Sequence, residues 1–193
     1  MKNIKKYSII IVLGLMVMAC KTEIVDVIDL NSLENGGYIR TVSPFPVAAT
    51  TFNYSLANIT GAGAKMEFVA EAVTPNKGAA FSSYDLAIKF VDATPANGNK
   101  TGTSQVLKSI ASSAFTKDAT TGYPRATIAV TGSEALAASK VALTDITDGD
   151  RFEITGTMKL TDGKSFTVAN TGLNITGGAF YSSPFFYRVN VIK

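Results

Sequence analysis

The residue types that most often carry out catalysis are scarce in this chain. It contains no histidine, which excludes Ser-His-Asp and Cys-His catalysis as well as metal sites built on imidazole. Walker, dinucleotide-binding and zinc motifs are absent as well. Catalysis would therefore depend on paired carboxylates, as it does in glycosidases. The candidates, all expected on solvent-facing sides of strands, are Glu67, Glu71, Asp85, Asp92 and Glu153. We predict that the protein is not an enzyme.

One acidic segment has the composition of a cation site. Asp145, Asp148 and Asp150 lie within six residues, and their carboxylates are hard oxygen ligands of the kind that Ca²⁺ prefers. The spacing departs from that of an EF-hand loop. The alternative is that Asp148-Gly149 forms the turn into the next strand, with Asp145 and Asp150 capping it. Apart from this calcium candidate and the lipid described below, the sequence predicts no cofactor.

Aromatic residues form the second candidate site. The chain has 11 Phe and 7 Tyr but no Trp, and five of these aromatics lie between residues 180 and 187. Exposed rings beside polar groups are typical of sugar-binding platforms, and Phe180 and Tyr181 are the candidate ligand contacts. The alternative is core packing, because Phe185 and Tyr187 would share one face of a strand.

The N-terminal segment determines what Cys20 is for. Lys2, Lys5 and Lys6 precede an apolar run from Ser8 to Ala19, which is shorter than the about 20 residues of a membrane span. This pattern predicts a cleavable export signal over residues 1–19. The sequence Val17-Met18-Ala19-Cys20 resembles a bacterial lipoprotein box, which implies that Cys20 is linked to diacylglycerol and becomes the mature N-terminus. The alternative is a retained N-terminal anchor with a buried cysteine.

Charge and tether composition bear on partners and location. The chain has 18 Lys and Arg against 15 Asp and Glu, and residues 1–19 contain three Lys and no acid, so 15 basic and 15 acidic residues remain after cleavage. A balanced charge argues against nucleic acid as a partner. Residues 20–36 read as a lipidated tether. Lys21, where an aspartate would suggest inner-membrane retention, resembles outer-membrane routing, and either face of that membrane remains open.

Period-two alternation dominates residues 37–193, which are long enough for one domain. Asp162-Gly163 follows one alternating run and precedes Phe166 and Val168, which predicts a hairpin. An Ala-rich stretch from Ser133 to Val141 predicts one short helix with Ser133 as its cap. We therefore expect an all-β fold, a single Ig-like β-sandwich with one short helix. The expected core-facing runs are Phe52-Tyr54-Leu56, Met66-Phe68-Ala70, Tyr84-Leu86-Ile88-Phe90, Ala126-Ile128-Val130, Phe152-Ile154-Gly156-Met158-Leu160 and Phe185-Tyr187-Val189-Val191.

A family resemblance extends over most of residues 36–193. It rests on the segments Gly36-Gly37-Tyr38-Ile39-Arg40-Thr41, Asp148-Gly149-Asp150-Arg151-Phe152, Leu160-Thr161-Asp162-Gly163-Lys164-Ser165-Phe166 and Asn174-Ile175-Thr176-Gly177-Gly178-Ala179-Phe180 with Ser183-Pro184-Phe185. Together with the lipoprotein box, these segments look like the small β-sandwich lipoproteins of Bacteroidota. Genes of that group often lie beside a TonB-dependent SusC-like transporter and a SusD-like lid. The resemblance implies a location and a fold, and it supplies no catalytic or binding residues.

The function expected from these observations is non-catalytic. The protein would be an outer-membrane lipoprotein and an accessory binding or interaction subunit of a TonB-dependent (SusC/SusD-like) nutrient-uptake complex. The end loops near Pro95–Thr103 and Thr176–Ser183 would contribute contacts. The alternative is a structural surface protein, either a fimbrillin-like subunit or an adhesin, in which Arg40 would be a maturation site.

Overall fold

The computed structural model describes residues 36–45, 52–177, 183 and 185–193. The chain divides into two units, residues 1–35 and 36–193, and all described residues belong to the second. The expected signal peptide, the lipidation site Cys20 and the ligand candidates Phe180 and Tyr181 lie outside the described residues. No helix within the described ranges is long and apolar enough to cross a membrane.

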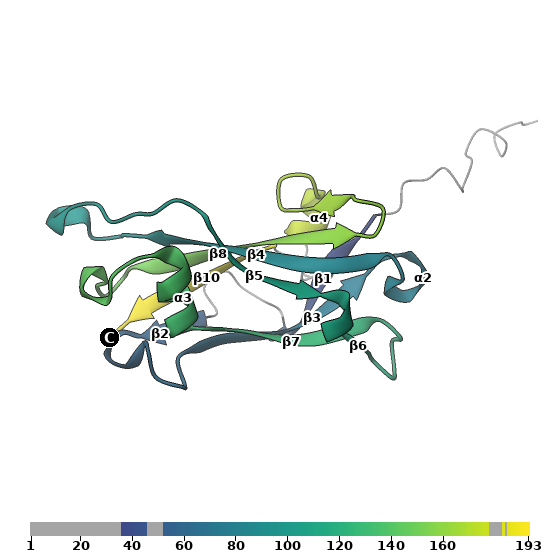
Figure 1. The fold of residues 1–193 in the computed structure, drawn as a ribbon, viewed down its shortest axis with the longest axis horizontal. Helices are drawn as coiled ribbons and strands as arrows, with labels where there is room; N and C mark the ends of the chain where they lie inside the picture. Colours follow the sequence, from purple (N-terminus) through teal and green to yellow (C-terminus); the bar gives the residue numbers. More distant parts are fainter. Residues whose placement is uncertain (1–35, 46–51, 178–182, 184) are drawn as a thin grey trace, which may run out of the picture. The chain divides into compact units, whose positions relative to one another are not determined.

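The strands form two sheets, which Figure 1 shows as two layers. The first sheet has the order β1 (Tyr38–Ser43), β3 (Lys65–Val73), β7 (Pro124–Thr131), β6 (Thr116–Lys117). The second has the order β2 (Phe52–Ser55), β10 (Phe186–Ile192), β8 (Arg151–Leu160), β4 (Phe81–Val91), β5 (Gln105–Ala111), and β9 (Ser165–Phe166) also pairs with β8. Only the β2–β10 pair is parallel among these strand pairs. The prediction of an all-β domain is confirmed.

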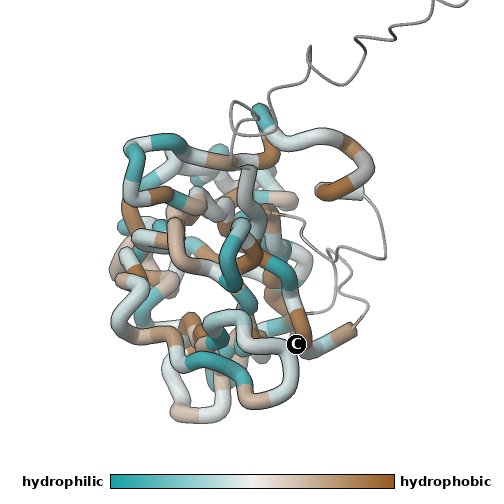
Figure 2. Tube along the Cα trace, turned by 90° about the vertical axis from the view of Figure 1, so that its right-hand side faces the viewer, coloured by the Kyte–Doolittle hydropathy of each residue, from teal (hydrophilic) through white to brown (hydrophobic). Residues whose placement is uncertain are grey.

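The core lies between the two sheets and consists of the apolar residues at every second position along the strands. Figure 2 shows hydrophobic and hydrophilic positions alternating along the trace. Phe68 of β3 stacks on Tyr187 of β10 with ring centroids 4.5 Å apart, and Tyr54 of β2 donates a hydrogen bond to the Val130 carbonyl of β7 over 2.8 Å. These contacts join one sheet to the other, since each pair has one residue in each sheet. Burial at Tyr84, Phe152 and Phe185 confirms the expected core faces.

The predicted hairpin is present but shorter than expected. Gly163 has φ +86°, the conformation that the turn after β8 requires, and Met158 pairs with Phe166. The second strand ends at Phe166, although the alternation extends to Val168. The backbone N–H and hydroxyl of Thr167 both donate to Oδ1 of Asn170, which makes a local turn instead of a longer strand.

The predicted helix is α3 (Gly132–Ser139), but its cap is not Ser133. Thr131 caps the helix by accepting from the N–H of Glu134, and the Glu134 carboxylate accepts from the N–H of Thr131 in return. The expected cap was therefore placed two residues too late. The other helical segments are single turns: η1 (Leu56–Asn58), α2 (Pro75–Gly78), η2 (Pro95–Asn97), η3 (Ser112–Ala114), η4 (Leu143–Asp145) and α4 (Leu173–Thr176).

Strand register defines the two ends of the domain. At one end Tyr38 pairs with Val73, and Phe81 pairs with Leu160; we call this the Gly36 end. At the other, Val91 pairs with Arg151, and we call it the Asp150 end. The loop at 95–103 follows β4 at the Asp150 end, whereas α4 belongs to the Gly36 end (Figure 1). The first of the two loops expected to contribute contacts therefore lies at the Asp150 end, and the described start of the second, Thr176 and Gly177, lies at the Gly36 end.

Candidate functional site

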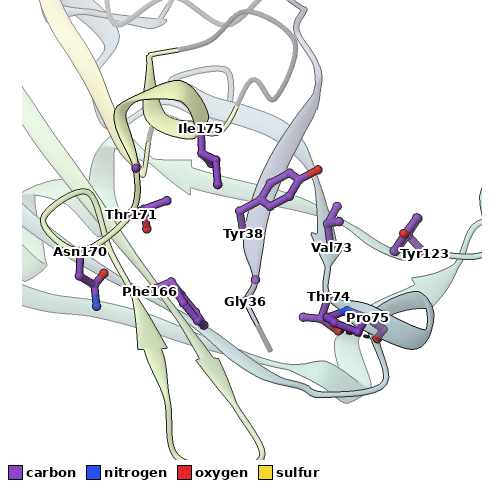
Figure 3. A pocket seen from close by; sticks show the side chains of 12 residues that line it. Gly36, Tyr38, Val73, Thr74, Pro75, Tyr123, Phe166, Asn170, Thr171 and Ile175 are labelled. Carbon is purple, nitrogen blue, oxygen red and sulfur yellow. Dashed lines mark hydrogen bonds between the residues drawn. The ribbon is translucent and has the colours of Figure 1, made fainter. Parts of the chain in front are cut away.

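A cavity of about 470 Å³ opens at the Gly36 end. This volume lies within the range of about 300–1,000 Å³ that is usual for small-molecule sites. Figure 3 shows its walls, which come from the start of β1, the end of β3, the turn before β7, the segment after β9 and α4. The lining residues are Gly36, Gly37, Tyr38, Val73, Thr74, Pro75, Tyr123, Phe166, Asn170, Thr171, Gly172 and Ile175.

Local hydrogen bonds, a turn and one close approach between strands fix the positions of the cavity walls. Asn170 donates through Nδ2 to the Ser165 carbonyl over 2.8 Å and accepts from the N–H of Thr167 over 2.7 Å, which ties the segment after β9 to the hairpin. Thr74 is extended, and Pro75 begins α2, where its missing N–H costs nothing. Gly37 passes so close to β8 that an added Cβ would lie 3.1 Å from Met158 Sδ. Residues in turns and at the ends of several strands thus shape the cavity.

The lining is apolar and carries no formal charge among the residues that the structure describes. Its apolar side chains include those of Tyr38, Phe166, Val73 and Ile175 (Figure 3). One polar atom is exceptional, because Thr171 Oγ1 is buried without a hydrogen-bond partner in the described part of the chain. The arrangement therefore suits an uncharged, largely apolar ligand.

The acidic segment at the Asp150 end is organised as a turn. Asp150 is fully buried and accepts from the backbone N–H groups of Ala93 over 2.8 Å and Thr147 over 2.7 Å. Asp148 accepts from the N–H of Lys193, and Asp145 forms an ion pair with Lys100 at 3.5 Å. Within the described ranges no group of three His, Cys, Asp or Glu could hold a metal ion. The three candidate calcium ligands therefore bind separate donors. Asp150 caps the turn, which is the role that the alternative interpretation gave it.

A second buried carboxylate stabilises the loop beside this turn. Asp92 accepts through Oδ1 from the N–H of Thr94 over 2.8 Å and through Oδ2 from the N–H of Lys100 over 2.9 Å. Both bonds close the loop that follows β4. Asp92 was a candidate for catalysis, but both of its oxygens are used to hold backbone.

Glu71 corrects the expectation that the candidate carboxylates are solvent-exposed. It does lie on the outer face of the first sheet, yet its side chain is fully buried because Arg40 and Arg125 cover it. Arg40 Nη2 donates to Oε1, and Arg125 Nε donates to Oε2 over 2.6 Å. Thr121 also donates to Oε2 over 3.1 Å. A carboxylate held by two guanidinium groups favours a structural role over proton transfer.

The remaining candidate carboxylates lie apart on the surface and have cationic partners. Glu67 pairs with Lys65 at 2.7 Å, and Glu153 pairs with Arg151 at 2.9 Å. Asp85 pairs with Lys159 at 2.7 Å. Burial alone would raise the pKa of Asp85, but hydrogen bonds from Lys159, Ser109 and Ser83 outweigh it and lower the pKa below its usual value. The structure therefore brings none of these residues together as a carboxylate pair.

The aromatic cluster divides between core residues, the half-buried Phe186 and residues outside the described ranges. Phe185 and Tyr187 are each about 1% exposed and pack in the core, as the alternative reading expected. Sequence reasoning missed the aromatic wall residues Tyr38, Tyr123 and Phe166, which lie at the start of β1, in the turn before β7 and at the end of β9. A hydrogen bond between Thr41 Oγ1 and the Tyr187 hydroxyl, 2.9 Å long, was not anticipated either. Burial raises the pKa of Tyr187 to about 12, so its hydroxyl stays neutral near pH 7.

Comparison with known proteins adds no relative to this description. The chain matches no protein-family model, and no curated protein matches its sequence.

Proposed function

We propose that this chain is a non-catalytic outer-membrane lipoprotein that serves as an accessory binding or interaction subunit of a TonB-dependent, SusC/SusD-like uptake complex. The support for the anchor is the lipoprotein box ending at Cys20, preceded by a basic and then an apolar segment. The support for the binding role is the cavity at the Gly36 end. The fold offers loops at its ends as contact surfaces.

We infer that the domain is an Ig-like sandwich. Immunoglobulin sandwiches pair strands A-B-E-D in one sheet and G-F-C in the other, with C′ added beside C in the variable type. The order β1-β3-β7-β6 corresponds to A-B-E-D, and β10-β8-β4-β5 corresponds to G-F-C-C′. In this correspondence the cavity lies among the B–C, D–E and F–G loops. Variable domains use two of these loops, B–C and F–G, for binding.

The observation that carries the proposal is the position of Gly36. This residue lines the cavity and is also where the described domain begins, 16 residue steps after Cys20. An extended chain of that length spans at most about 55 Å. A lipid on Cys20 would thus keep Gly36 within about 55 Å of the membrane surface, where a transporter partner would also lie. The carboxylates of the described domain, held by cations or backbone donors, are in keeping with a role without turnover.

Mass spectrometry of the mature N-terminus tests the anchor. We expect a chain that begins at Cys20 and carries acyl groups, recovered in the outer-membrane fraction. A chain produced from residue 20 with Cys20→Ala should be soluble and should melt at the same temperature as the released wild-type domain, because the anchor lies outside the domain. An unmodified thiol at Cys20, or a retained residue 1–19 segment, would contradict the lipoprotein proposal.

The structural alternative makes a different prediction at Arg40. A fimbrillin-like subunit matured at this position would begin at Thr41. In the structure, however, Arg40 lies inside β1 between Ile39 and Thr41, both of which pair with β3, and its guanidinium binds Glu71. Cleavage there would require β1 to separate from the sheet. A mature N-terminus at Thr41, together with filaments in sheared surface material, would favour the alternative over the uptake subunit.

A further inference from the structure

Exposed apolar side chains border the cavity at the Gly36 end. Leu173, the first residue of α4, is 83% exposed, and Val168 in the segment after β9 is 50% exposed. Both segments also contribute lining residues to the cavity, namely Ile175 and Asn170. Apolar surface that continues from a cavity onto its rim is typical of binding sites for apolar partners.

We propose that this cavity binds a hydrocarbon chain of a lipid. Its volume of about 470 Å³ corresponds to about sixteen water-sized groups at about 30 Å³ each, enough for much of one acyl chain. Tyr38, Phe166 and Ile175 provide an apolar wall without formal charge. Burying methylene groups there is favourable by about 0.8 kcal/mol each.

The choice of a lipid over other apolar ligands rests on the proposed function, because the tether would hold this end of the domain near a bilayer. Two sources share the same chemistry. The acyl groups on Cys20 itself are one, since the tether of at most about 55 Å is long enough to fold back. A lipid of the surrounding membrane is the other.

The absence of tryptophan from the chain makes a site-specific optical test available. Phe166→Trp places the only tryptophan in the cavity wall, and Val106→Trp places it on β5 opposite Ala87, where Val106 is 85% exposed. Both are made in the chain from residue 20 with Cys20→Ala. The probe is monomeric lysophosphatidylcholine with a brominated acyl chain, which quenches indole on contact. We expect saturable quenching in the Phe166→Trp protein and none in the Val106→Trp protein.

A charge in the cavity supplies the matched control. Ile175→Glu in the Phe166→Trp background should weaken the apparent affinity for the brominated lipid at least tenfold, because a carboxylate is unfavourable beside buried methylene groups. Ile192→Glu adds the same charge at the exposed end of β10, where Ile192 is 44% exposed, and should leave the affinity unchanged. Melting temperatures show whether each variant is folded. Equal quenching of both tryptophans, or quenching unaffected by Ile175→Glu in a folded protein, would overturn the proposal.

The acylated protein distinguishes the two sources. If the lipid on Cys20 fills the cavity, the acylated Phe166→Trp protein resists quenching that the Cys20→Ala protein shows. If a membrane lipid fills it, both proteins are quenched alike. Absence of quenching in the folded Cys20→Ala protein would refute the lipid site. The proposed function fails separately, since an unmodified Cys20 in the mass spectrum would remove the tether while lipid quenching persisted.

Discussion

Arg125 on β7 donates through Nε to Oε2 of Glu71 on β3 over 2.6 Å, and the two residues are direct register partners in the first sheet. Arg40 on β1 is the register partner of Glu71 on the other side and binds its second oxygen. Three strands are therefore joined by one row of charges across the outer face. The Glu71 side chain is fully buried beneath this row, on a face that alternation assigns to solvent.

Replacing Glu71 by Gln should destabilise the domain by about 2 kcal/mol. The substitution keeps the shape but leaves Arg40 without its anion and Arg125 with Asp118 as its remaining carboxylate partner. Removing one partner of a fully buried pair costs about 3–5 kcal/mol. Arg40 and Arg125 are 32% and 25% exposed, so water reduces the effect. Glu67→Gln is the matched control on the same strand face, where the partner Lys65 is exposed, and should cost under about 1 kcal/mol. Equal urea midpoints for the two variants would show that the charge row does not stabilise the sheet.

Thr131 should be the important cap of α3. Thr131→Ala removes the acceptor for the N–H of Glu134 and should cost about 1 kcal/mol in the free energy of unfolding. Ser133→Ala should have little effect, because Ser133 makes only a 3.4 Å hydrogen bond to the Thr60 carbonyl. Thermal denaturation of both variants provides the comparison. A larger loss for Ser133→Ala would return the cap to the residue that the sequence suggested.

Gly163→Val should be costly for reasons of backbone conformation alone. Gly163 has φ +86°, and no atom lies within 4 Å of the position of an added Cβ, so a steric clash cannot account for a loss. The expected cost is about 1–3 kcal/mol, the range for a β-branched residue held at positive φ. Gly163→Asn should cost less, because asparagine tolerates this region. A melting temperature for Gly163→Val within about one degree of wild type would contradict the assigned turn.

Calcium should not stabilise the domain. Asp145, Asp148 and Asp150 each bind a separate donor, so a cation would have to displace hydrogen bonds that hold the turn. We expect no heat on titration with Ca²⁺ and no change in melting temperature with chelator. Asp150→Asn should instead lower stability without calcium, because Asp150 accepts from both Ala93 and Thr147. A calcium-dependent rise in melting temperature that Asp150→Asn abolished would restore the metal site.

The alternation of apolar and polar residues predicted the strands that have a neighbouring strand on each side. It failed for one strand at the edge of a sheet. Phe152, Ile154 and Met158 face the core of a central strand, and their spacing was sufficient to identify β8. Edge strand β5 shows no such period, because Lys108 crosses to the Ala129 carbonyl of the other sheet and the register shifts between Leu86 and Ala87 of its neighbour. Edge strand β2 was nevertheless predicted, because Phe52 and Tyr54 alternate with exposed residues and are buried.

The candidate site depends on contacts between residues that lie far apart in the sequence, which no local pattern reveals. Glu71 is buried by arginines 31 and 54 positions away, so its exposure could not be read from its own strand. The cavity likewise joins Tyr38 and Phe166, which no local pattern relates. Turn chemistry at Asp162-Gly163 predicted the hairpin, but not that the chain would leave the sheet after Phe166. It also could not show that the segment after β9 and the start of β1 enclose one space.

Affinity purification of the tagged, acylated protein from gently solubilised outer membranes tests the central claim most directly. The account predicts recovery of a TonB-dependent β-barrel in near-stoichiometric amount, identified by mass spectrometry of the eluate. The chain carrying Cys20→Ala, expressed with the same tag, should recover much less, because loss of the anchor removes the local concentration at the membrane. Recovery of the acylated protein alone, or as a homopolymer, would contradict the uptake-subunit proposal.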